Sequence, residues 1–167
     1  MSEAATILVQ LLGAPQVRLG ARVLPFPPDQ RHQLLAHLAA AGGWVGRERL
    51  AFLFWPDEPQ DTARRNLRRL LHRVRGLGWL PSLAVEEGRL CWTVPTDVRT
   101  FEAAVQNGRW AQALGEYGGP LLEGLEGAGT GEYANWLLAE RERLHGLWRQ
   151  ARRQRGEELE RDRKSVV

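Results

Sequence analysis

The spacing of hydrophobic residues divides the start of the chain into short strands and a helix. Apolar stretches at 7–12, 16–19 and 22–24 are separated by segments rich in glycine, alanine and proline, which predicts a small antiparallel sheet. Apolar residues then recur at three- and four-residue steps from Leu34 to Ala41, directly before a pair of glycines. This change of period predicts a first helix that ends at the glycine pair.

Two further helices and a hairpin are predicted in the same part of the chain. Residues 44–56 place leucine and phenylalanine on one face of a short helix, and the final proline cannot continue it. A third helix begins near Pro59 and runs to about residue 78. Residues 83–94 alternate apolar and polar positions around Glu87-Gly88, a pair typical of a two-residue turn. Strands, three helices and a closing hairpin predict an α+β winged helix-turn-helix domain over residues 1–95.

The remainder of the chain, residues 96–167, has the pattern of an all-α domain. Two apolar stripes between residues 101 and 117 predict an antiparallel helix pair, and a glycine-rich loop follows at 118–131. Apolar residues at three- and four-residue steps from Tyr133 to Ala151 predict a last helix. Beyond Ala151 almost every residue is polar, so we expect the chain to fray there.

The third predicted helix concentrates positive charge on one side. The segment 63–76 holds six arginines, and the only acidic residue of the helix, Asp61, stands at its start. A projection at 100° per residue separates an apolar arc from a polar arc. The apolar arc contains Ala63, Leu67, Leu70, Leu71 and Val74. The opposite arc contains Thr62, Arg65, Arg68, Arg69, His72 and Arg73, and Arg64 and Arg75 lie on its flank.

This arrangement favours an external polyanion as the partner of the helix. Arginines four residues apart repel one another by a few tenths of a kcal/mol per pair, and a helix selected only for stability would intersperse glutamate. An α-helix fits the DNA major groove, where arginine donates two hydrogen bonds to guanine and others bind phosphates. Arg89, next to the predicted turn, would reach the neighbouring backbone or minor groove. The predicted DNA-binding residues are Thr62, Arg64, Arg65, Arg68, Arg69, His72, Arg73 and Arg89.

Several phrases of the sequence resemble one family. The segments VGRERLAFLFWPD and ARRNLRRLLHRVRGLG are similar to the DNA-binding domain of Streptomyces antibiotic regulatory protein (SARP)-type activators, whose winged helix is of the response-regulator output kind. The segments DVRTFEAAV, ALGEYGGPLLEGL and WLLAERERLHGLW resemble the bacterial transcriptional activator domain (BTAD) that follows it, a tetratricopeptide (TPR)-like helical module. The resemblance extends from about residue 7 to residue 155.

The resemblance implies a sequence-specific transcription activator. Such a protein binds direct repeats of double-stranded DNA upstream of a promoter, often as paired protomers, and contacts RNA polymerase. Two features depart from the family pattern. Gly46 stands where a serine or threonine usually caps the second helix, and glycine stabilises that position less. The helical domain is about half of the expected array, so we expect a shortened form of a longer protein or a reduced regulator.

Composition adds limits to this interpretation. Arginine outnumbers lysine 22 to 1, so the placement of arginine is more informative than its abundance. The first 95 residues hold 12 arginines against 8 acidic residues, whereas the rest is slightly acidic. The single cysteine excludes an internal disulfide framework, and neither a secretory signal nor an apolar run of membrane-spanning length is present. We therefore expect a cytoplasmic protein with no membrane partner.

No catalytic or metal-binding constellation is apparent, and we expect no enzyme activity and no cofactor. The histidines at 32, 37, 72 and 145 lack metal-ligand spacing and are expected on the surface. Ser2, Ser82 and Ser165 lie outside any nucleophile motif, and GAGTGE at 127–132 lacks the ending of a phosphate loop. The seven tryptophans lie mostly on apolar faces and are expected in the core.

Two other functions remain open at this level. The chain could be a protein-interaction scaffold in which the winged helix is an adaptor or dimerisation element, because a fold does not fix a function. RNA binding is a third interpretation, but the predicted sheets lack an aromatic surface on which bases could stack.

Overall fold

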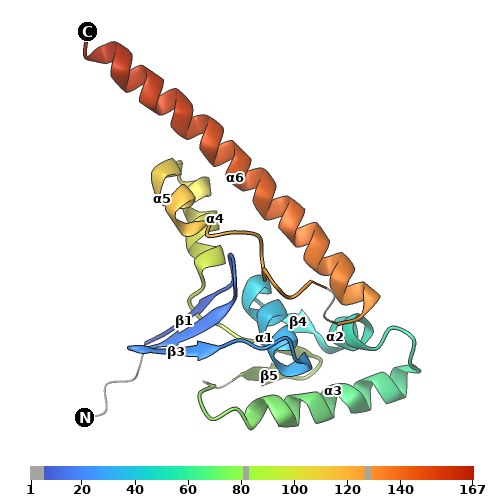
Figure 1. Cartoon of the computed structure of the whole chain (residues 1–167). Coiled ribbons are helices and arrows are strands. Elements are labelled where there is room, and N and C mark those ends of the chain that lie inside the picture. Colours follow the sequence, from blue (N-terminus) through green and yellow to red (C-terminus); the bar gives the residue numbers. More distant parts are fainter. Residues whose placement is uncertain (1–5, 81–82, 127–128) are drawn as a thin grey trace.

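A computed structural model of the chain describes residues 6–80, 83–126 and 129–167, and it contains two small sheets followed by helices (Figure 1). The predicted order of strands, three helices, hairpin and further helices is confirmed. The elements are β1 (Ile7–Gln10), β2 (Gln16–Leu19), β3 (Arg22–Pro25), α1 (Gln30–Ala41), β4 (Val45–Gly46), α2 (Arg47–Phe54), α3 (Gln60–Arg75), β5 (Ala84–Glu86), β6 (Arg89–Cys91), α4 (Asp97–Gln106), α5 (Trp110–Glu116) and α6 (Gly131–Ser165).

The two sheets are both antiparallel and three-stranded. The first has the order β1-β2-β3, and the valines at 9 and 17 stand opposite each other and point into the core. The second has the order β4-β6-β5, so the predicted hairpin of β5 and β6 pairs with a short strand directly before α2. This sheet fits the wing of a winged helix, and β4 ties the wing to the helices.

Local signals fix where the first two helices begin and end. The side chain of Asp29 accepts a hydrogen bond from the backbone N–H of His32 at 3.0 Å, so α1 starts four residues earlier than its apolar pattern suggests. Gly42 ends α1 in the left-handed conformation, with φ 67°, which glycine adopts without strain. Gly46 precedes α2 without a side-chain cap, as the sequence indicated.

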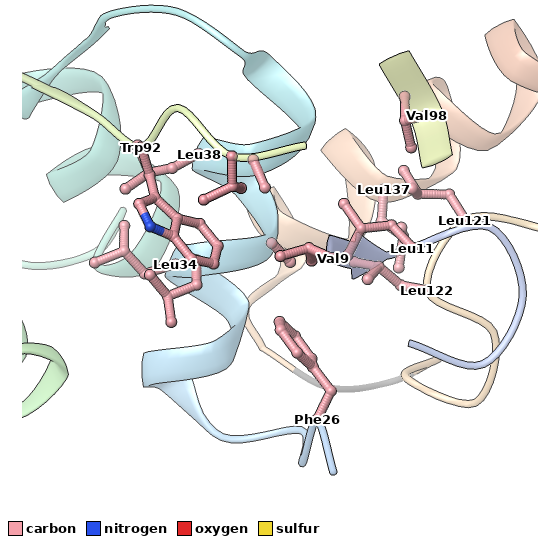
Figure 2. Packing of buried hydrophobic residues seen from close by; sticks show 14 of the residues in the cluster. Val9, Leu11, Phe26, Leu34, Leu38, Trp92, Val98, Leu121, Leu122 and Leu137 are labelled. Carbon is pink, nitrogen blue, oxygen red and sulfur yellow. The ribbon is translucent and has the colours of Figure 1, made fainter. Parts of the chain in front are cut away.

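One continuous hydrophobic core joins the parts of the chain before and after Pro95. Figure 2 shows Trp92 against Leu34 and Leu38 of α1, with side chains from β1, α4 and α6 farther along the same core. The strand β1 also contacts the boundary, because the N–H of Val9 donates to the carbonyl of Pro95 at 3.0 Å and Val9 forms a parallel bridge with Thr96. The division into domains at 95 remains a prediction.

Asp97 is the buried charged group that fastens α4 to the end of β1. Its two carboxylate oxygens accept hydrogen bonds from the backbone N–H groups of Leu11 and Leu12 at 2.8 and 2.9 Å. Burial raises the pKa of this carboxyl group. We expect Asp97→Asn to lower the free energy of unfolding by about 1–3 kcal/mol, because an amide offers one oxygen for the two donors. Urea denaturation measures this loss, and an unchanged midpoint would contradict the assigned role.

The end of α6 corrects the expectation of fraying. The helix continues to Ser165, although most side chains after Ala151 are exposed (Figure 1). Glutamate, glutamine and arginine favour helix intrinsically, and Arg155 pairs with Glu158 at 3.2 Å along the helix. Polarity alone was therefore a poor sign of where this helix ends.

Two histidines are buried, which corrects their expected surface position. His32 and His37 are each 3% exposed, and the helix that carries them, α1, is buried without interruption from 32 to 39. Nδ1 of His32 lies 2.7 Å from Asp29, and the His37 ring packs edge-on against Trp136. A helix enclosed on all sides has no solvent-exposed face for its polar residues. His72 and His145 are exposed as expected.

Burial of His37 predicts a loss of stability in acid. Burial, aided by the charge of Arg49, lowers the pKa of His37 to about 4, whereas the same group in the unfolded chain has a pKa near 6.5. Between these values the unfolded chain binds the proton more tightly, so the free energy of unfolding falls as pH falls. The loss attributable to this group is about 3 kcal/mol between pH 6.5 and pH 4. Urea denaturation at both pH values, with His37→Phe as the control, measures it; an equal loss in the variant would contradict this cause.

Six of the seven tryptophans are buried or lie against the core, as predicted. Trp92 is almost fully enclosed, and five others pack partly buried against the core cluster. Trp44 is the exception, with 41% of its surface exposed. The GAGTGE segment and two of the serines, Ser2 and Ser82, involve residues outside the described ranges.

Candidate nucleic-acid interface

The helix α3 presents its arginines outward from a leucine-packed base. Pro59 precedes its first turn, and Asp61 places a negative charge near the positive end of the helix dipole. The five residues of the predicted apolar arc are all at most 4% exposed, which confirms the predicted buried face: Ala63, Leu67, Leu70, Leu71 and Val74. This base holds α3 against α1 and α2. Figure 1 shows α3 along one side of the molecule, while α6 runs away from it.

The outer face of α3 carries four arginines without an internal counter-charge. Arg65, Arg68, Arg69 and Arg73 are exposed, and none forms an ion pair within residues 6–80, 83–126 and 129–167. His72 on the same face is exposed, and Thr62 is half-buried. Neither the carboxylates nor the C-terminal half of the described chain covers these guanidinium groups.

Arg64, on the flank of α3, is held by carboxylates. Its guanidinium group lies 2.7 Å from Glu48 of α2 and 3.9 Å from Asp61. The pair with Glu48 joins the two helices at the surface, where such a bond contributes at most about 1 kcal/mol. Arg64 is therefore oriented beside the exposed face, and a stronger anion could displace its partner.

Stabilisation of the helix dipole explains only some of the positive charges on α3. The last turn of α3 holds His72, Arg73 and Arg75, where cations interact favourably with the helix dipole. Arg65, Arg68 and Arg69 lie before that turn and gain nothing from it. Their mutual repulsion has no compensation within the described chain.

A hollow between α3, the start of α2 and the turn of the wing gathers further arginines. Its volume is about 610 Å³, and Arg47, Arg64 and Arg68 line it together with Glu48 and with Gly88 of the turn. The N–H of Arg47 donates to the carbonyl of Gly88 at 2.9 Å, which fixes the wing against α2. Three cationic side chains from two helices thus border one concave surface beside the wing.

Sequence analysis missed Arg47 as a member of this surface. Its Nε atom is buried and has no hydrogen-bond partner within the described residues. The one sequence signal was its place directly after Gly46, at the uncapped start of α2. That signal alone says nothing about α3, because only the folded chain brings Arg47 beside Arg68.

Arg89 lies on the wing but is engaged by neighbours. Its guanidinium group donates two hydrogen bonds to one carboxylate oxygen of Glu86, from Nε at 2.8 Å and from Nη2. The same group stands 4.3 Å from the centre of the Trp44 ring, a cation–π contact. Arg89 is exposed, so it keeps a free side toward solvent, but its position is set by two protein partners.

Across the described ranges, no group of three or more histidine, cysteine, aspartate or glutamate residues could hold a metal ion. Within the same ranges, no helix is long and apolar enough to cross a membrane.

Comparison with known proteins gives a likeness to a solved structure. No family model and no curated protein matches the chain. The fold is similar to that of EmbR from Mycobacterium tuberculosis, solved in complex with a low-affinity phosphopeptide, with a TM-score of 0.58 and 22% sequence identity. The match covers 88% of this chain and 45% of the EmbR chain, so this chain spans less than half of EmbR. The likeness concerns the fold, in which a winged helix precedes helices.

Proposed function

We propose that the protein is a DNA-binding transcription regulator that places α3 in the major groove. The observation that carries this proposal is the row of four exposed arginines, none of them paired with a described carboxylate, on a helix whose opposite face is buried in the core. A duplex supplies the phosphates and guanine edges that such a row lacks internally. The fold likeness to EmbR agrees with a regulator of this type.

The hollow beside the wing extends the proposed contact beyond α3. Phosphates of one strand would lie against Arg47 and Arg64, with the wing turn next to them. Arg89 would then bind the backbone or minor groove from its exposed side. In this arrangement Arg68 and Arg69 read bases, while the flanking cations fix the position of the helix.

The salt dependence of binding tests the proposal. If α3 and the wing neutralise about 5 phosphates, the slope of log K against log salt should be near −4.5. Fluorescence anisotropy with a labelled random duplex, titrated at several salt concentrations, measures the slope. No binding at low salt would favour the scaffold function, and a slope near zero would exclude a phosphate interface.

The family resemblance suggests how such a regulator would act. The proposal therefore includes activation of transcription, contact with RNA polymerase, an operator of direct repeats and paired protomers on DNA. Selection of bound sequences from random duplexes would give the operator, and the spacing of its repeats would report the number of protomers.

A further inference from the structure

A second concave site lies away from the cationic face of α3. It is a cavity of about 420 Å³ between the end of α1, the segment around β4, the first half of α2 and the first half of α6. A volume of this size is within the usual range for sites that bind small molecules. Trp44 and Arg49 at its border are both exposed, so a ligand can reach the cavity from solvent.

Two aromatic and two smaller apolar residues contribute to the lining of the cavity. Trp44 and Trp136 line it from different elements, together with Ala40 and Val45. The guanidinium group of Arg89 lies over the Trp44 ring, and His37 packs edge-on against Trp136 with 4.5 Å between ring centres. Both aromatic walls are thus held in place before any ligand arrives. Planar rings fit such walls.

The polar groups of the cavity include a buried imidazole and an exposed arginine. His37 lines the cavity, and its Nδ1 atom is buried without a hydrogen-bond partner among the described residues. Its lowered pKa keeps the ring neutral at physiological pH. Arg49 lines the same cavity, and no described residue forms an ion pair with it.

The charged residues that line the cavity favour a ligand with a single negative charge. Arg143 also lines the cavity, but Glu140, 2.9 Å away, and Glu102 both bind its guanidinium group. Arg49 is therefore the cation left for a ligand, and its planar fork matches a carboxylate. Glu140 in the wall would repel a second negative charge.

We propose that this cavity binds a small planar aromatic carboxylic acid, with its ring between Trp44 and Trp136 and its carboxylate on Arg49. The site uses none of the exposed arginines of α3, and it adjoins the wing through Arg89, which lies over the Trp44 ring. A DNA-binding surface on α3 together with a ligand cavity elsewhere is an arrangement suited to a regulator that responds to a ligand.

Calorimetric titration of the full chain with 2-naphthoate tests the site, and 2-naphthamide serves as the neutral probe with the same ring. We expect saturable binding of 2-naphthoate with a Kd below about 1 mM, and binding of 2-naphthamide weaker by roughly tenfold or more. Arg49→Gln should remove the preference for the anion. Arg153→Gln, which changes an exposed arginine of α6 outside the cavity, should leave both affinities unchanged.

Ala40→Phe fills the cavity and should abolish binding of both probes. Circular dichroism checks that this variant folds, and Arg49→Gln at the surface provides the test if it does not. Lack of saturable binding of 2-naphthoate by the unmodified chain would overturn the proposal. Equal binding of the two probes, or binding that survives in a folded Ala40→Phe variant, would also overturn it.

Discussion

Replacement of Arg68 and Arg69 together by alanine is expected to weaken binding of a cognate duplex by a factor between about 30 and 10⁴. Each arginine that reads a base contributes about 1–3 kcal/mol, and the two losses add if the side chains contact different base pairs. Both residues are exposed in the middle of α3, so the fold should not change. The free energy of unfolding should stay level or rise slightly, because repulsion between neighbouring arginines is removed.

A gel-shift titration measures the loss, and a matched variant separates base contacts from net charge. Arg149→Ala with Arg153→Ala removes the same charge from two exposed positions four residues apart on α6. We expect this control to bind nearly as the unmodified chain does, apart from a small general electrostatic loss. Equal weakening of both double variants would show that net charge rather than α3 governs binding. Unchanged affinity of the α3 variant would defeat the assignment of α3 as the recognition helix.

Tyr133→Ala is expected to cost about 3–5 kcal/mol of unfolding free energy, the largest effect on stability that we predict. The side chain is fully buried at the start of α6 and packs against Phe54 of α2 and Trp136. Its hydroxyl group donates to the carbonyl of Gln33 in α1 at 3.0 Å. One residue therefore binds α6 to two helices of the winged-helix part, and its removal leaves a cavity between them.

The conservative variant Tyr133→Phe distinguishes packing from hydrogen bonding. It keeps the ring and loses the bond to Gln33, so we expect a cost of about 0.5–1.5 kcal/mol. Urea denaturation followed by tryptophan fluorescence measures both variants. A loss below about 1 kcal/mol for Tyr133→Ala would mean that α6 contributes little to the shared core, contrary to its burial.

Elements with a strong local pattern were predicted well from the sequence. The leucines of α3 recur at helical steps, so they form one apolar face. That face is expected to be buried whatever element packs against it. The wing hairpin follows from a glycine at a turn that requires φ 77°, which disfavours other residues. Polar termini were predicted poorly, because the extension of α6 to Ser165 depends on helix propensity and on pairs along the helix rather than on an apolar stripe.

The sequence by itself determined the amphipathic α3 and the place of its arginines, since both depend only on the period of the helix. The tertiary structure decided which of those arginines are free, because Glu48, the partner of Arg64, lies 16 residues away on another helix. It also placed Arg47 beside α3, buried His37 and formed the cavity against α6. Each of these depends on contacts between segments far apart in the chain, and periodicity along one segment contains no information about them.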